Sequence, residues 1–180
     1  MRHFSLIWLC LFIASPAQAQ ALDGLVIGIA DGDTLYVLDA RHNSYKVRLL
    51  GIDAPEHGQA FGERSKQSLA RMAYRQPVRI DWQEHDIYGR ILGRVMTAPA
   101  DCRQPVCPKN FDVNLAQVRL GFAWWNKKFA DSQFPGDAPV YATAERQARA
   151  DCLGLWADPY PVPPWRWRYA NRIEQDKVKP

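Results

Sequence analysis

The chain has 180 residues, of which 47% are hydrophobic and 23% are charged, a composition typical of one globular domain with a buried core. Its net charge of +4 is too small to make the whole surface attractive to polyanions, so any nucleic-acid binding must come from local placement of charge. The segment from Trp165 onward, with five basic and two acidic side chains, holds most of that excess.

The N-terminal segment MRHFSLIWLCLFIASPAQAQ has the organisation of a secretory signal peptide. A basic start precedes an apolar stretch from Phe4 to Ala14, which is too short to span a bilayer comfortably. Two overlapping A-x-A sites would allow cleavage after Ala19 or after Ala21. We expect residues 1–21 to be a cleaved leader and the protein to be exported, periplasmic or secreted, with no membrane attachment after cleavage. An uncleaved anchor is the alternative.

Hydrophobic periodicity predicts five strands, at residues 25–30, 34–39, 44–52, 78–85 and 91–97. The turn D-G-D (31–33) joins the first two as a hairpin. Three helices are predicted, at residues 63–74, at 113 to about 120 and at 139–153. Asp112 has the position of an N-cap for the second of these helices. Five strands with one helix after the third, followed by further helices, are the order of an α+β fold with an OB-type barrel.

A Pro- and Cys-rich loop is predicted at residues 98–110. Without the leader, Cys102, Cys107 and Cys152 remain in an oxidising compartment. No His or Cys cluster completes a zinc site around C-x4-C, so a disulfide is the better interpretation. Pro105 favours a turn that would pair Cys102 with Cys107 and leave Cys152 free. Pairing of Cys152 with Cys102 or with Cys107 remains the rival hypothesis.

The C-terminal stretch PYPVPPWRWR (159–168) is interpreted as an extended arm because it is rich in proline. The domain organisation expected from the sequence is therefore a leader at 1–21, one folded domain at 22–158 and a basic, Pro/Trp-rich arm at 159–180.

Charged residues gather near the predicted strand ends. Asp33 begins the second strand, Arg48 lies in the third, Asp53 and Glu56 follow it, and Arg90 precedes the last. Each alone is explained as a turn residue, a cap or surface charge. In a small barrel, however, the start of one strand and the end of its neighbour can share a rim, which would bring two carboxylates together. Their repulsion would require a cation, and an oxygen-rich site suits Ca²⁺.

Three blocks of the sequence carry these charges: D-G-D-T-L (31–35), R-L-L-G-I-D-A-P-E (48–56) and D-I-Y-G-R (86–90). In order and in spacing they resemble the staphylococcal nuclease (thermonuclease) family. The similarity continues through V-N-L-A-Q-V-R-L-G-F-A (113–123) to G-L-W (154–156) and covers roughly residues 23–158. The resemblance implies an OB-type barrel with nuclease activity.

The resemblance also implies roles for single residues. The calcium ligands of the family fall on Asp33, Asp53 and the main-chain carbonyl of Ala54, where the family often has threonine. A carbonyl ligand survives that change. The general base, or water-orienting carboxylate, falls on Glu56.

The phosphate-clamping arginines of the family fall on Arg48 and Arg90, and a tyrosine near the terminal phosphate falls on Tyr88. Two tyrosines near the nucleotide base fall near Lys127 and Phe129, so only one aromatic side chain is kept there. An aromatic ring at that place could stack on any base, worth about 1–3 kcal/mol. The long lysine-rich loop that the family prototype has after Glu56 is replaced by the short segment HGQAFG.

The function implied by the resemblance is that of a calcium-dependent endonuclease, which the leader would export and which we expect to be a monomer. It would hydrolyse DNA and RNA with little sequence specificity and leave 3′-phosphate ends. The alternative is a catalytically silent OB-fold module that binds oligonucleotides, since fold alone does not fix function. A binding module would be free to lose Glu56 or an arginine, whereas this chain keeps all five charged positions.

Overall fold

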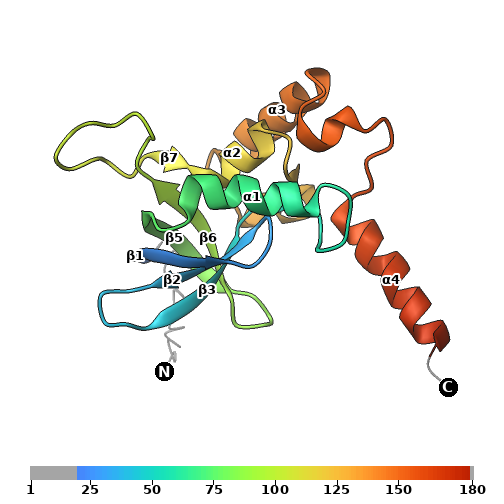
Figure 1. The fold of residues 1–180 in the computed structure, drawn as a ribbon, viewed down its shortest axis with the longest axis horizontal. Helices are drawn as coiled ribbons and strands as arrows, with labels where there is room; N and C mark the ends of the chain where they lie inside the picture. The colour runs from blue at the N-terminus through green and yellow to red at the C-terminus, as the bar shows by residue number, and fades with distance from the viewer. Residues whose placement is uncertain (1–19, 179–180) are drawn as a thin grey trace, which may run out of the picture.

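The computed structural model describes residues 20–178, and Figure 1 shows a β-barrel with helices packed around it. The sheet order is β3-β2-β1-β5-β6, and a parallel pairing of β3 with β6 closes the barrel. The other barrel pairs are antiparallel. The barrel strands are β1 (Gln20–Ile29), β2 (Thr34–Leu38), β3 (Ser44–Leu49), β5 (Pro77–His85) and β6 (Ile91–Thr97). The α+β fold with a five-stranded OB-type barrel is thus confirmed.

Alternating side chains of the strands fill the barrel. In β6 every second residue from Ile91 to Thr97 is buried, while the residues between them are partly exposed. Helix α1 (Gly62–Ala73) covers the barrel with Leu69 and Ala73, both fully buried. Each large apolar side chain buried in this way stabilises the fold by about 1.5–3 kcal/mol.

The third predicted strand (44–52) is divided in two. Strand β3 ends at Leu49, and Gly51 adopts a φ of 77°, a left-handed conformation that side chains with a Cβ rarely take. The chain then forms the short strand β4 (Ile52–Asp53), which pairs with β8 (Trp124–Trp125) outside the barrel sheet. This turn sets Asp53 opposite Trp124.

Four further helices lie between β6 and the C-terminal segment, and the first of them packs against β6 and α1. They are α2 (Val113–Arg119) after strand β7 (Phe111–Asp112), α3 (Asp137–Ala150), and the 3₁₀ helices η1 (Lys127–Ser132) and η2 (Gly154–Ala157). Asp112 caps α2 as expected, since its Oδ1 accepts a hydrogen bond from Leu115 N at 2.9 Å. Buried Asn114 ties α2 to the barrel because its Nδ2 donates to Leu50 O and Gly93 O at 3.1 and 3.0 Å.

The interpretation of the C-terminal stretch as an extended arm is wrong. Residues Pro164–Val178 form the helix α4, and the proline-rich segment 158–163 before it belongs to no helix or strand. Proline is well tolerated at the first helical position because its missing N–H needs no partner there. Residues 165–178 contain neither proline nor glycine, so nothing interrupts the helix. Figure 1 shows α4 beginning close to the loop before α1 and extending away from the barrel.

The loop between β6 and β7 is closed by a disulfide between Cys102 and Cys107, which confirms the favoured pairing. Cys152 is free and exposed. The predicted leader lies almost wholly outside the described residues, but Gln20 and Ala21 already belong to β1 and pair with Trp82 and Asp81. Among residues 20–178 no helix is long and apolar enough to cross a membrane.

Candidate active site

The D-G-D turn places a buried carboxylate at the start of β2. Asp31 Oδ1 accepts a hydrogen bond from Asp33 N at 3.0 Å, which fixes the turn. The side chain of Asp33 is only 2% exposed, and its two oxygens accept hydrogen bonds from Thr34 Oγ1 at 3.1 Å and from Ala54 N at 2.7 Å. Asp33 therefore joins the β1–β2 turn to the segment that follows β4.

Hydrogen bonds from helix α2 hold this turn in place. Fully buried Gln117 donates from Nε2 to Gly32 O at 2.7 Å and to Ser65 O at 3.1 Å. Position 32 must be glycine, because a Cβ there would lie 1.9 Å from Ser65 Oγ. Helices α1 and α2 thus determine where the Asp33 carboxylate stands.

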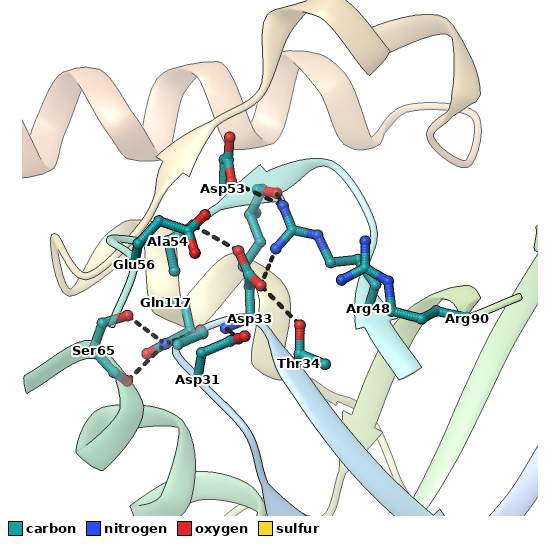
Figure 2. Close-up of polar contacts among 12 residues, drawn as sticks. Asp31, Asp33, Thr34, Arg48, Asp53, Ala54, Glu56, Ser65, Arg90 and Gln117 are labelled. Atoms are coloured by element: carbon teal, nitrogen blue, oxygen red, sulfur yellow. Dashed lines mark hydrogen bonds and ion pairs between the residues drawn. The ribbon is translucent and has the colours of Figure 1, made fainter. Parts of the chain in front are cut away.

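Arg48 extends toward both aspartates (Figure 2). Its register partner in β2 is Thr34, the residue that follows Asp33. Nη1 forms an ion pair with Asp33 Oδ1, and Nη2 lies 2.9 Å from Asp53 Oδ1. Burial alone would lower the pKa of Arg48, but the charges of Asp33 and Asp53 raise it above its usual value. Arg48 is therefore a permanent cation between two buried carboxylates.

The carboxylates Asp33 and Asp53 fit a further cation. Burial raises the pKa of Asp33 to about 7, even though Arg48 opposes this effect. Asp33 pairs with Arg48, whereas Asp53 pairs with both Arg48 and Arg168, so a metal ion bound here would have to replace part of these contacts. Within residues 20–178 no group of three His, Cys, Asp or Glu side chains gathers to hold a metal. The donors at hand are two carboxylates and nearby main-chain carbonyls such as that of Ala54, which suit a hard cation that keeps water ligands.

A cavity of about 410 Å³ opens beside these residues, and its walls include Arg48, Asp53, Tyr88, Arg90 and Phe129. Arg90 is held by Asp86, whose Oδ2 accepts from Arg90 Nε at 2.6 Å and whose Oδ1 accepts from Arg90 N at 2.9 Å. Burial alone would raise the pKa of Asp86, but the hydrogen bonds from Arg90 lower it below its usual value. Because the contact to Asp86 uses Nε, both terminal nitrogens of Arg90 remain for a ligand.

Tyr88 and Phe129 border this cavity with exposed rings. Tyr88 is 77% exposed, and the guanidinium carbon of Arg90 lies 5.5 Å from the centre of its ring. Phe129 comes from η1 and is 46% exposed. Lys127 borders a neighbouring cavity instead, with its Nζ 5.9 Å from the centre of the Trp125 ring. Two of the three residues assigned to substrate binding therefore share a cavity with Arg48 and Arg90, and the third lies next to it.

Arg168 is the residue that sequence reasoning missed. From α4 it grips Asp53 at two points, with Nη1 3.1 Å from Oδ1 and Nη2 2.7 Å from Oδ2, and it also forms an ion pair with Glu56 Oε1. The hydrogen bond to Asp53 raises the pKa of Arg168 above its usual value. Glu56 is 34% exposed and is linked to Asp53 through this guanidinium. The only signal in the sequence was the excess of basic residues after Trp165.

This arrangement suits a bound phosphate. Guanidinium groups grip paired phosphate oxygens at two points, which an ammonium group cannot do. A cation held by Asp33 and Asp53 would neutralise charge on the same oxygens, and Glu56 is a carboxylate that can accept a proton from water. The chemistry that these groups support best is hydrolysis of a phosphate ester.

Comparisons with known proteins agree with this chemistry. A family model described as staphylococcal nuclease homologue matches residues 46–158. The chain is 43% identical to protein ParB of Escherichia coli, over 93% of this chain and 90% of that protein. It is 41% identical to the micrococcal nuclease of Shigella flexneri, over 90% of this chain and 88% of that protein. An uncharacterized endonuclease of Haemophilus influenzae is 37% identical, over 82% and 74% respectively.

Proposed function

Because the chain belongs to the staphylococcal nuclease family, we propose that it is an endonuclease that uses calcium to hydrolyse both DNA and RNA. It acts with little sequence specificity, cleaves on the 5′-oxygen side of the phosphodiester and leaves 3′-phosphate ends. The observation that carries this proposal is the cluster in which Arg48 contacts both Asp33 and Asp53 beside the cavity that Arg90 borders.

Each charged residue has a distinct task in this proposal. Arg48 and Arg90 bind the phosphoryl oxygens from two sides and favour the transition state, in which those oxygens gain negative charge. Glu56 orients a water molecule and accepts its proton as the water attacks phosphorus. Tyr88 donates a hydrogen bond near the terminal phosphate. The preference for nucleic acid over smaller phosphate esters comes from aromatic side chains near the cavity, which stack on any base.

Calcium is the cation that this donor set favours, since it accepts carboxylate, carbonyl and water oxygens in flexible geometry. Asp33, Asp53 and the carbonyl of Ala54 would hold it, and its charge would polarise the phosphate. Both oxygens of Asp53 are already contacted by guanidinium nitrogens, Oδ2 by Arg168. Arg168 must therefore yield part of its contact with Asp53 when calcium binds, and that frees it to face the substrate.

Export is part of the proposal and rests on the N-terminal sequence. Strand β1 begins at Gln20, so cleavage after Ala19 would keep the whole strand, whereas cleavage after Ala21 would remove two residues that pair with β5. Intact-mass measurement on protein from culture fractions checks this, with a mature N-terminus expected at Gln20 or Leu22. A full-length mass in the exported fraction would contradict cleavage.

Digestion of single-stranded DNA and of RNA tests the activity. We expect fragments with 3′-phosphate ends from both substrates in the presence of calcium, and no fragments from metal-free protein kept in EGTA. Labelling of the products before and after phosphatase treatment identifies the ends. Full activity in EGTA would overturn the calcium requirement. The absence of cleavage, together with binding of both nucleic acids, would favour a silent oligonucleotide-binding module.

A further inference from the structure

A second, larger cavity of about 790 Å³ lies beside the candidate active site, between the segment after β8 and the start of α4. Its volume falls within the range of about 300–1,000 Å³ that small-ligand pockets occupy. Half-buried Trp125 and Trp165, which is 44% exposed, both line it. Trp165 is fixed there by buried Trp124, whose ring it meets edge to face with centroids 6.3 Å apart. The cavity is therefore built partly by the C-terminal segment.

The charges around this cavity favour an anionic occupant. Lys127 and Lys128 lie on its rim and are exposed, and Arg168 also borders it. Its acidic lining residues, Asp53 and Glu145, are both paired with arginines within the described part of the chain. Basic side chains beside exposed aromatic rings are the combination with which proteins bind single-stranded nucleic acid.

This cavity continues the candidate active site. Asp53, Asn126, Phe129 and Arg168 border both this cavity and the one that contains Arg48 and Arg90. A nucleotide chain whose phosphodiester lies beside Arg48 and Arg90 would thus pass Arg168 before its next base reaches the tryptophan-lined space. The ion pairs of Arg168 with Asp53 and Glu56 hold its guanidinium at that junction.

We propose that the larger cavity is a second nucleobase subsite, which takes a base next to the scissile phosphodiester of single-stranded DNA or RNA. Trp125 and Trp165 provide the stacking surfaces, and Lys127 and Lys128 attract the adjoining phosphate. The inference rests on the proposed nuclease function and adds to it a role for α4 as a substrate-binding element.

The test compares substrates of two lengths on matched variants of the full chain. Trp165→Leu keeps an apolar side chain against Trp124 but removes the aromatic face. Tyr169→Ala is the control, because Tyr169 lies on the same helix, is 64% exposed and does not border the cavity. A nitrophenyl phosphodiester of a single nucleoside has one base and cannot fill a second base site. The kcat/KM of an octanucleotide relative to that of this ester should therefore fall about tenfold in Trp165→Leu, or about 1.4 kcal/mol. The same ratio should stay unchanged in Tyr169→Ala.

The subsite would be overturned if the ratio of the two kcat/KM values were the same in Trp165→Leu as in the parent. Circular dichroism must show that both proteins are folded. Fluorescence anisotropy of a labelled octanucleotide separates this result from failure of the proposed function. If the parent cleaves neither substrate, the nuclease proposal fails. An about tenfold weaker Kd for Trp165→Leu would then still support the subsite, and an equal Kd would overturn it.

Discussion

Replacing Arg48 or Arg90 with lysine is expected to lower the cleavage rate by about 10²–10³, roughly 2.7–4 kcal/mol, although the charge is kept. The reason is geometric. Arg48 already uses two terminal nitrogens to contact two carboxylates. Arg90 is oriented by Asp86 through Nε, and its terminal nitrogens bond to no other side chain among residues 20–178. An ammonium group cannot reproduce either arrangement, because it acts as a point charge.

The rates are measured on single-stranded DNA at saturating calcium, with folding checked by circular dichroism. Arg79→Lys is the matched control, since Arg79 also pairs with an aspartate, Asp81, but is 53% exposed and lies outside both cavities. If the Arg48 and Arg90 variants both keep more than about a third of the parent rate, the loss is under about 1 kcal/mol and the clamp is absent.

Glu56→Gln is expected to lower turnover by about 10²–10⁴, the usual contribution of a positioned general base. The amide has nearly the same shape as the carboxylate but cannot accept a proton from water. Substrate affinity should change little, because no phosphate contact is assigned to Glu56. Single-turnover rates and oligonucleotide Kd values, both with calcium present, separate the two effects.

Glu63→Gln controls for loss of a nearby negative charge, since Glu63 lies in the first turn of α1 and pairs only locally, with Gln67. An unchanged rate in folded Glu56→Gln would remove Glu56 from the mechanism. The ion pair of its carboxylate with Arg168 would then be a structural contact.

The barrel and the charged cluster could be predicted because their signals are local. The alternation of side chains in the sequence of β6 predicts its alternating burial. Asp112 caps α2 by accepting a hydrogen bond from a residue three positions further along the chain. The D-G-D turn likewise places Asp33 through its own neighbours. Such short-range patterns survive without knowledge of the tertiary structure.

The contribution of α4 could not be predicted for the opposite reason. The prolines before and at the start of the helix led to the prediction of an extended chain. Pro164 is compatible with the first position of a helix, but it is also typical of extended segments. Arg168 meets Asp53 across 115 residues of sequence, a contact set by how the chain passes from η2 to α4. The division of the third strand at Gly51 depends similarly on its pairing with β8.

A calcium titration tests the central claim, that Asp33 and Asp53 form the cation site of this nuclease. Isothermal titration calorimetry of metal-free protein should detect one calcium ion per chain and no binding at that site in folded Asp53→Asn. Arg168→Ala should bind calcium more tightly than the parent, because the competing guanidinium is removed from Asp53. A parent protein that takes up no calcium, or an Asp53→Asn variant that binds it as the parent does, would contradict the claim.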